Sequence, residues 1–130
     1  MSKSDYLEVE LLKWCTGQSN ALGTAPTPWI GLYTANPSDA GGGTEVSGGS
    51  YARVSSAAKW ATPSAGSVSN NAEIAFPTAS AGWGTVTAFG LFDASSGGNL
   101  LRWAALGASK AVDSGDTARF ASSTLTFTED

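Results

Sequence analysis

Hydrophobic positions along the chain change their spacing once, near Gly17. Before it, large apolar residues recur at helical spacing in two groups, Leu7, Leu11 and Trp14 on one side and Val9, Leu12 and Cys15 on the other. The pattern predicts one amphipathic helix, which Asp5 can cap with Glu8 three residues on. Gly17 suits the left-handed position where a helix stops.

A helix this short is marginal alone in water, so it must dock on its own domain or on a neighbour. We expect Leu7, Leu11 and Trp14 to be buried by a partner protein. Cys15, on the second group, is expected to be a small buried hydrophobic residue. Residues 1–17 are therefore predicted to form an N-terminal helical arm.

After Gly17 the apolar residues alternate, and clusters of Gly, Pro, Asn, Asp or Ser separate short runs rich in Thr, Val and aromatics. These runs are predicted strands at Pro28–Thr34, Tyr51–Ser55, Ser67–Asn70, Ala72–Phe76, Thr85–Asp93, Asn99–Leu106, Lys110–Val112, Thr117–Phe120 and Thr124–Thr128. Many short strands at this spacing predict a mainly β fold, an antiparallel, jelly-roll-like β-sandwich over residues 18–130.

Two of the strands resemble each other, because each carries a central glycine, Gly31 or Gly90, followed by a polar turn. A glycine weakens a strand unless something packs closely over it. We expect an aromatic side chain such as Trp60 or Trp83 to cross the sheet at these glycines, although a chance resemblance is equally compatible with the pattern.

Small residues dominate the composition: Ala, Gly, Ser and Thr make up 68 of the 130 residues. Seven basic residues against eleven acidic ones give a net charge of -4, which opposes a nucleic-acid-binding surface. No apolar run approaches the ~20 residues of a membrane helix. We therefore expect neither nucleic acid nor membrane as a partner.

Catalytic chemistry has little to build on, because the chain has no histidine and one cysteine. Its carboxylates fall mostly in predicted turns, where Asp caps the backbone: Asp39, Asp93, Asp113 and Asp116. Asp113 and Asp116 are too few for a dedicated calcium site. We expect no enzyme activity, no metal and no cofactor.

Two features remain as candidate contact sites. The Gly-rich stretch Asn36–Ser50 is long for a loop in a compact domain, and such loops are usually functional or mobile. We expect its residues Asp39, Glu45 and Val46 to contact a partner. Trp83, between two glycines in a predicted loop, is either a surface platform for a glycan or a core tryptophan, and the core is favoured.

Eight short motifs are spread along nearly the whole chain: Tyr6-Leu-Glu, Ile30-Gly-Leu-Tyr-Thr-Ala-Asn-Pro37, Thr44-Glu-Val-Ser-Gly-Gly-Ser-Tyr-Ala-Arg53, Phe76-Pro-Thr-Ala79, Trp83-Gly-Thr-Val-Thr87, Gly90-Leu-Phe-Asp-Ala94, Gly97-Gly-Asn-Leu-Leu101 and Ser114-Gly-Asp116. With these motifs the chain resembles a family of short phage virion proteins commonly labelled phage tail fibre proteins. The resemblance implies a virion structural protein and brings no catalytic residues.

This resemblance leaves three functions open. The first is a capsid cement or decoration protein, a homo-oligomer, expected to be a trimer, that is seated on the major capsid protein and stabilises the head. The second is a tail, collar or fibre component, and the third is a receptor- or glycan-binding module. In each case we expect assembly in the host cytoplasm and residence in the virion.

Overall fold

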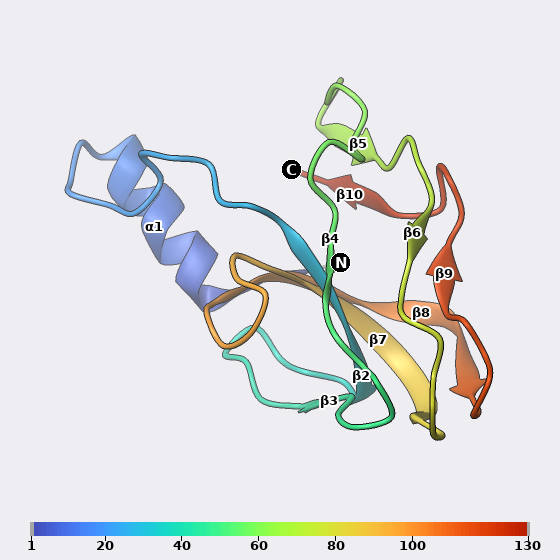
Figure 1. The fold of residues 1–130 in the computed structure, drawn as a ribbon. Coiled ribbons are helices and arrows are strands. Elements are labelled where there is room, and N and C mark those ends of the chain that lie inside the picture. Colours follow the sequence, from blue (N-terminus) through green and yellow to red (C-terminus); the bar gives the residue numbers. More distant parts are fainter. Residues whose placement is uncertain (1, 130) are drawn as a thin grey trace.

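The computed structural model describes residues 2–129, and these form a mainly β fold with one α-helix near the N-terminus (Figure 1). The elements are β1 (Ser2–Lys3), α1 (Asp5–Cys15), β2 (Trp29–Ala35), β3 (Thr44–Glu45), β4 (Val54–Ser55), β5 (Ser67–Ser69), β6 (Ile74–Ala75), β7 (Gly84–Phe92), β8 (Leu100–Val112), β9 (Arg119–Phe120) and β10 (Thr126–Thr128). The predicted fold class, antiparallel β with a short N-terminal helix, is confirmed.

One six-stranded sheet forms the first layer, in the order β1–β8–β7–β2–β3, with β4 also paired to β2. Every pairing is antiparallel, and the long strands β2, β7 and β8 lie at its centre. β4 pairs with the start of β2 and β3 with its end, so these two short strands share one edge of β2.

Two small antiparallel ladders, β5–β10 and β6–β9, form the second layer, along the right-hand side of Figure 1. The main core lies between the layers: Ile30, Leu32, Val86 and Phe89 of the large sheet pack with Ile74, Phe76, Leu125 and Phe127. Burying this apolar surface is the principal stabilising term of such a fold.

Strand β8 joins two segments that the sequence predicts as separate strands. The register with β7 passes from Val86↔Lys110 to Ala88↔Ala105, so residues 106–109 bulge out of the ladder. Gly107-Ala-Ser109, which separates the two predicted strands, is part of this bulge. β1 and β3, two residues each, are too short to leave a periodic pattern, and the predictions missed them.

The helix begins one residue away from the expected cap. Ser4, in extended conformation, accepts a hydrogen bond from the Leu7 amide through its Oγ at 3.2 Å, and Asp5 is the first helical residue. Ser4 is 3% exposed, and its own amide donates to the Leu101 carbonyl at 2.9 Å. The prediction of Asp5 as cap is therefore wrong, because β1 brings Ser4 to the sheet. Gly17 ends the helix with φ +73°, as predicted.

The first residues of the predicted arm belong to the large sheet, because β1 pairs with Trp103 and Arg102 of β8. Within the N-terminal part of the chain, α1 and the loop after it stand away from the large sheet (Figure 1). No helix within residues 2–129 is long and apolar enough to cross a membrane.

Candidate functional site

Helix α1 carries the most exposed large apolar side chains of the described residues. Val9 is 48% exposed, Leu12 65% and Trp14 64%. Val9 and Leu12 lie on one side of the helix and Trp14 on the other, so the three do not form one patch. Leu7 and Leu11 are partly buried, so of the three residues predicted to meet a partner, Trp14 is the one left open to solvent. Cys15 is exposed, which corrects the expectation of a buried thiol, because nothing covers the end of the helix.

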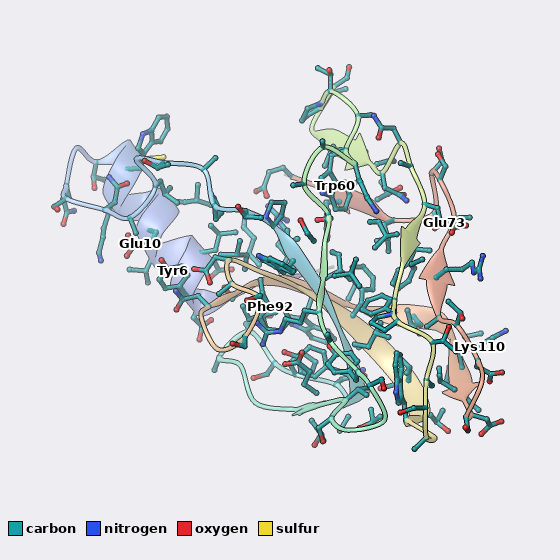
Figure 2. All side chains as sticks on the ribbon, viewed as in Figure 1. Tyr6, Glu10, Trp60, Glu73, Phe92 and Lys110 are labelled. Atoms are coloured by element: carbon teal, nitrogen blue, oxygen red, sulfur yellow. The ribbon has the colours of Figure 1, made fainter. Side chains whose placement is uncertain are left out.

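A buried carboxylate fixes the loop that follows the helix. Glu10, labelled in Figure 2, is 7% exposed and accepts hydrogen bonds from the Lys13 ammonium at 2.8 Å and the Ala21 amide at 2.6 Å. The Lys13 bond, followed by the Ala21 bond, lowers the pKa of Glu10 below its ordinary value. The arm is thus held by its own contacts, and the sequence pattern gave no indication of this role.

On the outer face of the large sheet, Gly31 of β2 and Gly90 of β7 pair directly. A Cβ atom on Gly31 would lie 2.9 Å from the Phe92 ring, and one on Gly90 3.0 Å from it. An aromatic side chain does cross the sheet here, as predicted. It is Phe92 and not Trp60 or Trp83, because both tryptophans lie on the other side, in or against the main core.

Arg53 stacks on the outer surface of Phe92, with its guanidinium carbon 3.4 Å from the ring centroid. The same guanidinium binds both carboxylate oxygens of Glu45, at 2.9 and 2.8 Å, and donates to the carbonyls of Ala94 and Gly97 at 2.9 Å each. Bidentate pairing of this kind fixes orientation as well as charge. Arg53 therefore ties the loop bearing Glu45 to the β7–β8 turn.

Tyr51 completes this polar network. Its hydroxyl donates to Glu45 Oε2 at 2.7 Å and accepts from the Leu32 amide at 2.9 Å. Leu32 lies on β2 between the residues paired with β4 and those paired with β3. Among residues 2–129, no strand amide or carbonyl faces the Leu32 N–H at this point, and the Tyr51 hydroxyl takes the place of the backbone acceptor. Burial, and then the bond to Glu45, raise the pKa of Tyr51, which keeps the hydroxyl protonated.

The charges of this network balance. Burial by itself raises the pKa of Glu45, but the hydrogen bonds from Arg53 and Tyr51 and the charge of Arg53 outweigh it, so the pKa of Glu45 lies below its ordinary value. Burial also raises the pKa of the neighbouring Tyr33 to about 12. The arrangement is an ion pair with a neutral phenol, and it presents no free base or nucleophile for catalysis.

The loop residues predicted to contact a partner are placed differently by the structure. Val46 is 5% exposed and lies in the main core, so that prediction is wrong for it. Glu45 is engaged by Arg53 and Tyr51. Asp39 accepts the Trp103 indole N–H at 3.2 Å, and its carbonyl accepts the Asp5 amide at 2.8 Å. The loop is fastened to its own domain, and contact of Asp39 or Glu45 with a partner stays a prediction.

Trp83 is a core residue. It is 5% exposed, its indole N–H donates to the Gly49 carbonyl at 2.9 Å, and its ring meets Tyr51 edge to face. Gly49 has φ +58°, and a Cβ there would lie 2.6 Å from the Ala81 carbonyl oxygen, so the loop can approach the ring only with glycine. The core alternative was correct, and Trp83 is not available as a glycan platform.

Turn carboxylates behave as the sequence predicts. Asp93 accepts the Asn99 amide at 2.7 Å, and Asp116 accepts the Asp113 amide at 2.9 Å. Among residues 2–129, no group of three or more Asp, Glu or Cys residues could hold a metal ion.

An apolar groove of about 380 Å³ lies between the β5–β10 ladder and strands β7 and β8. Its apolar lining is Pro28, Trp60, Pro63, Val68, Leu91 and Phe127. The indole N–H of Trp60 is already bonded to Ser56 Oγ at 3.1 Å, and the Trp60 ring tilts against Phe127 with centroids 5.2 Å apart. Figure 2 shows Trp60 beside β5. The sequence predictions did not identify this groove, because its lining comes from five separate segments.

Comparison with protein families gives a match over nearly the whole chain. A protein-family model described as Gp80, podophage GP4 fiber I protein gp80, matches residues 2–128. No curated protein matches the chain. The family match extends over the helix, both layers and the loops between them.

Proposed function

Because the chain belongs to the family described as podophage GP4 fiber I protein gp80, we propose that it is a structural component of the fibre or tail of a phage virion. The match over residues 2–128 is the observation that carries the proposal. It favours the tail, collar or fibre role over the capsid cement role, which is the first of the three functions expected from the sequence. The family also indicates the virion as the location.

The surfaces described above support a role in subunit contact. Helix α1 exposes large apolar side chains on both of its sides, and covering them by another protein would remove that apolar surface from water. A chain rich in Ala, Gly, Ser and Thr also presents few charges that would have to be desolvated on packing. We propose that copies of this chain, as a homo-oligomer such as a trimer, and other virion proteins are its partners, with no catalytic step.

Immunogold labelling of intact virions tests the proposal. Antibody raised against the purified chain should label the fibres or the tail, and particles made without the protein should lack that appendage while keeping filled heads. Label spread over the capsid surface would support the cement role instead. Absence of the protein from purified virions would overturn any structural role.

The receptor- or glycan-binding alternative depended on Trp83 at the surface. Since Trp83 is 5% exposed and bonded to Gly49, no predicted residue supports that function, and we do not propose it.

A further inference from the structure

A polar cavity of about 490 Å³ lies on the outer face of the large sheet, where three segments meet (Figure 1). These are the start of α1, the loop before β3 and the turn between β7 and β8, and Tyr33 and Phe92 of the sheet also line the cavity. The volume lies within the about 300–1,000 Å³ of small-molecule sites. We propose that this cavity binds a neutral, hydroxyl-rich compound of the size of one sugar ring.

A buried hydroxyl without a partner points to a ligand. Tyr33 is 5% exposed, and its ring stacks on Phe92 with the centroids 6.1 Å apart. The Tyr33 hydroxyl makes no hydrogen bond among the described residues, although burying a hydroxyl without one is unfavourable. Burial raises the pKa of this phenol to about 12, so it stays protonated and can both donate and accept. Because Tyr33 lines the cavity, its hydroxyl is available to a compound bound there.

Free acceptors lie on two other segments of the lining. The side-chain nitrogen of Asn99 donates to Asp93 Oδ2 at 2.9 Å, which leaves the amide oxygen of Asn99 without a donor among the described residues. The carboxylate of Asp5, exposed in the first turn of α1, makes no hydrogen bond or ion pair within residues 2–129. Asn99 and Asp5 both line the cavity with Tyr33. A compound with several hydroxyl groups matches this set, since each hydroxyl donates one hydrogen bond and accepts others.

The charges around the cavity disfavour an ion. Its described lining has one cation, Arg53, whose guanidinium is already paired with both carboxylate oxygens of Glu45. An anion would therefore meet the Asp5 carboxylate with no unpaired cation to balance it. A cation would meet Arg53 and the positive end of the α1 dipole. A neutral sugar avoids both costs and carries adjacent hydroxyl groups.

The cavity is distinct from the surface first considered for a glycan, because Trp83 lies in the main core on the other side of the large sheet. In the cavity the aromatic surface comes from Tyr6, labelled in Figure 2 at the start of α1. The partly buried Tyr6 ring can pack on the C–H groups of a sugar ring. Binding in this cavity does not depend on the proposed place of the chain in a virion appendage, so the two are tested separately.

Amide NMR shifts of the isotope-labelled full chain test the proposal. The probes are glucose, galactose, mannose and N-acetylglucosamine, each added as the free sugar and as its methyl glycoside. At least one of them should shift the amides of Tyr33, Asn99 and Gly42 saturably, whereas inorganic phosphate should not. Tighter binding of the methyl glycoside would indicate the end residue of a glycan as the source of the ligand, and tighter binding of the free sugar would indicate a monosaccharide.

Tyr33→Phe should weaken that binding by about tenfold, the loss of one hydrogen bond, while the thermal melt stays unchanged because the hydroxyl has no partner in the described fold. Asp5→Asn should weaken it severalfold. Asp113→Asn is the matched control, because Asp113 is exposed between β8 and β9 and does not line the cavity. No saturable shift with any of the sugars, phosphate shifting these amides while the sugars do not, or wild-type affinity in Tyr33→Phe would overturn the inference.

Discussion

Gly31 of β2 and Gly90 of β7 face each other across the ladder, and the ring of Phe92 occupies the space that their missing side chains leave. Arg53 closes the stack from outside, 3.4 Å from the ring centroid. The two glycines therefore allow an aromatic ring and an ion pair to lie directly on the sheet. This explains why two strands of different sequence share a central glycine.

Gly31→Ala should destabilise the fold by about 1–3 kcal/mol, the usual cost of overpacking. The new Cβ would lie 2.9 Å from Phe92, 3.0 Å from Glu45 Oε2 and 3.0 Å from the Tyr51 hydroxyl, so the whole network has to shift. The measurement is the free energy of unfolding in urea. Gly107→Ala is the control, because nothing lies within 4 Å of its added Cβ, and it should be neutral or slightly stabilising.

Tyr51→Phe should cost about 1–3 kcal/mol, because it leaves the Leu32 amide without an acceptor and removes one donor to Glu45. Thermal melts and amide exchange at Leu32 check this, and faster exchange at that amide is expected. Tyr6→Phe is the matched change, since the Tyr6 hydroxyl makes no hydrogen bond among the described residues. An unchanged Leu32 exchange rate in Tyr51→Phe would contradict the ladder role of the phenol.

Glu45→Gln should destabilise the chain at pH 7 by about 1.5–3 kcal/mol, the range for hydrogen bonds to charged groups. The pKa of Glu45 is lowered in the folded state, so its stabilising effect is present above the unfolded pKa of about 4.5. That effect is lost as the pH falls below this value and through the folded pKa. The difference between wild type and variant should therefore be constant from pH 7 to 5 and shrink below pH 4.5.

Urea midpoints measured from pH 7 to pH 3 give this profile. Glu8→Gln is the control, because Glu8 is exposed on α1 and its side chain makes no ion pair among residues 2–129. The difference in urea midpoint between Glu8→Gln and the wild type should not change with pH in the way expected for Glu45→Gln. A difference for Glu45→Gln that grows toward acid pH would show that the ion pair is not the cause.

Local patterns predicted most of the long elements. Helical spacing identified α1, and alternation between turn residues identified β2, β7 and both halves of β8. Local patterns could not predict which distant residues each side chain contacts. Ser4 replaces Asp5 as cap because β1 pairs with a strand a hundred residues away, and that pairing leaves no periodic trace in two residues.

The same reason explains the missed network and groove. In the sequence, Tyr51 is one residue of a predicted strand and Glu45 one residue of a predicted loop. Their role depends on Leu32 of β2, which is paired with neither β3 nor β4. The Gly31 and Gly90 pattern correctly predicted a close aromatic contact, but not which ring makes it. Phe92 is two residues from Gly90 on the same strand and on the same face, and strand periodicity of 2 could have indicated it.

Two tryptophan substitutions separate fold stability from assembly. Trp83→Ala should destabilise the fold by about 3–5 kcal/mol, because it empties a core position and leaves the Gly49 carbonyl without its donor. Trp14→Ala should change stability by less than about 0.5 kcal/mol, since Trp14 is 64% exposed. Urea unfolding of both variants, measured at a concentration where the wild type is monomeric, tests this contrast. A large loss of stability in Trp14→Ala under those conditions would mean that the arm is part of the fold and not a free contact surface.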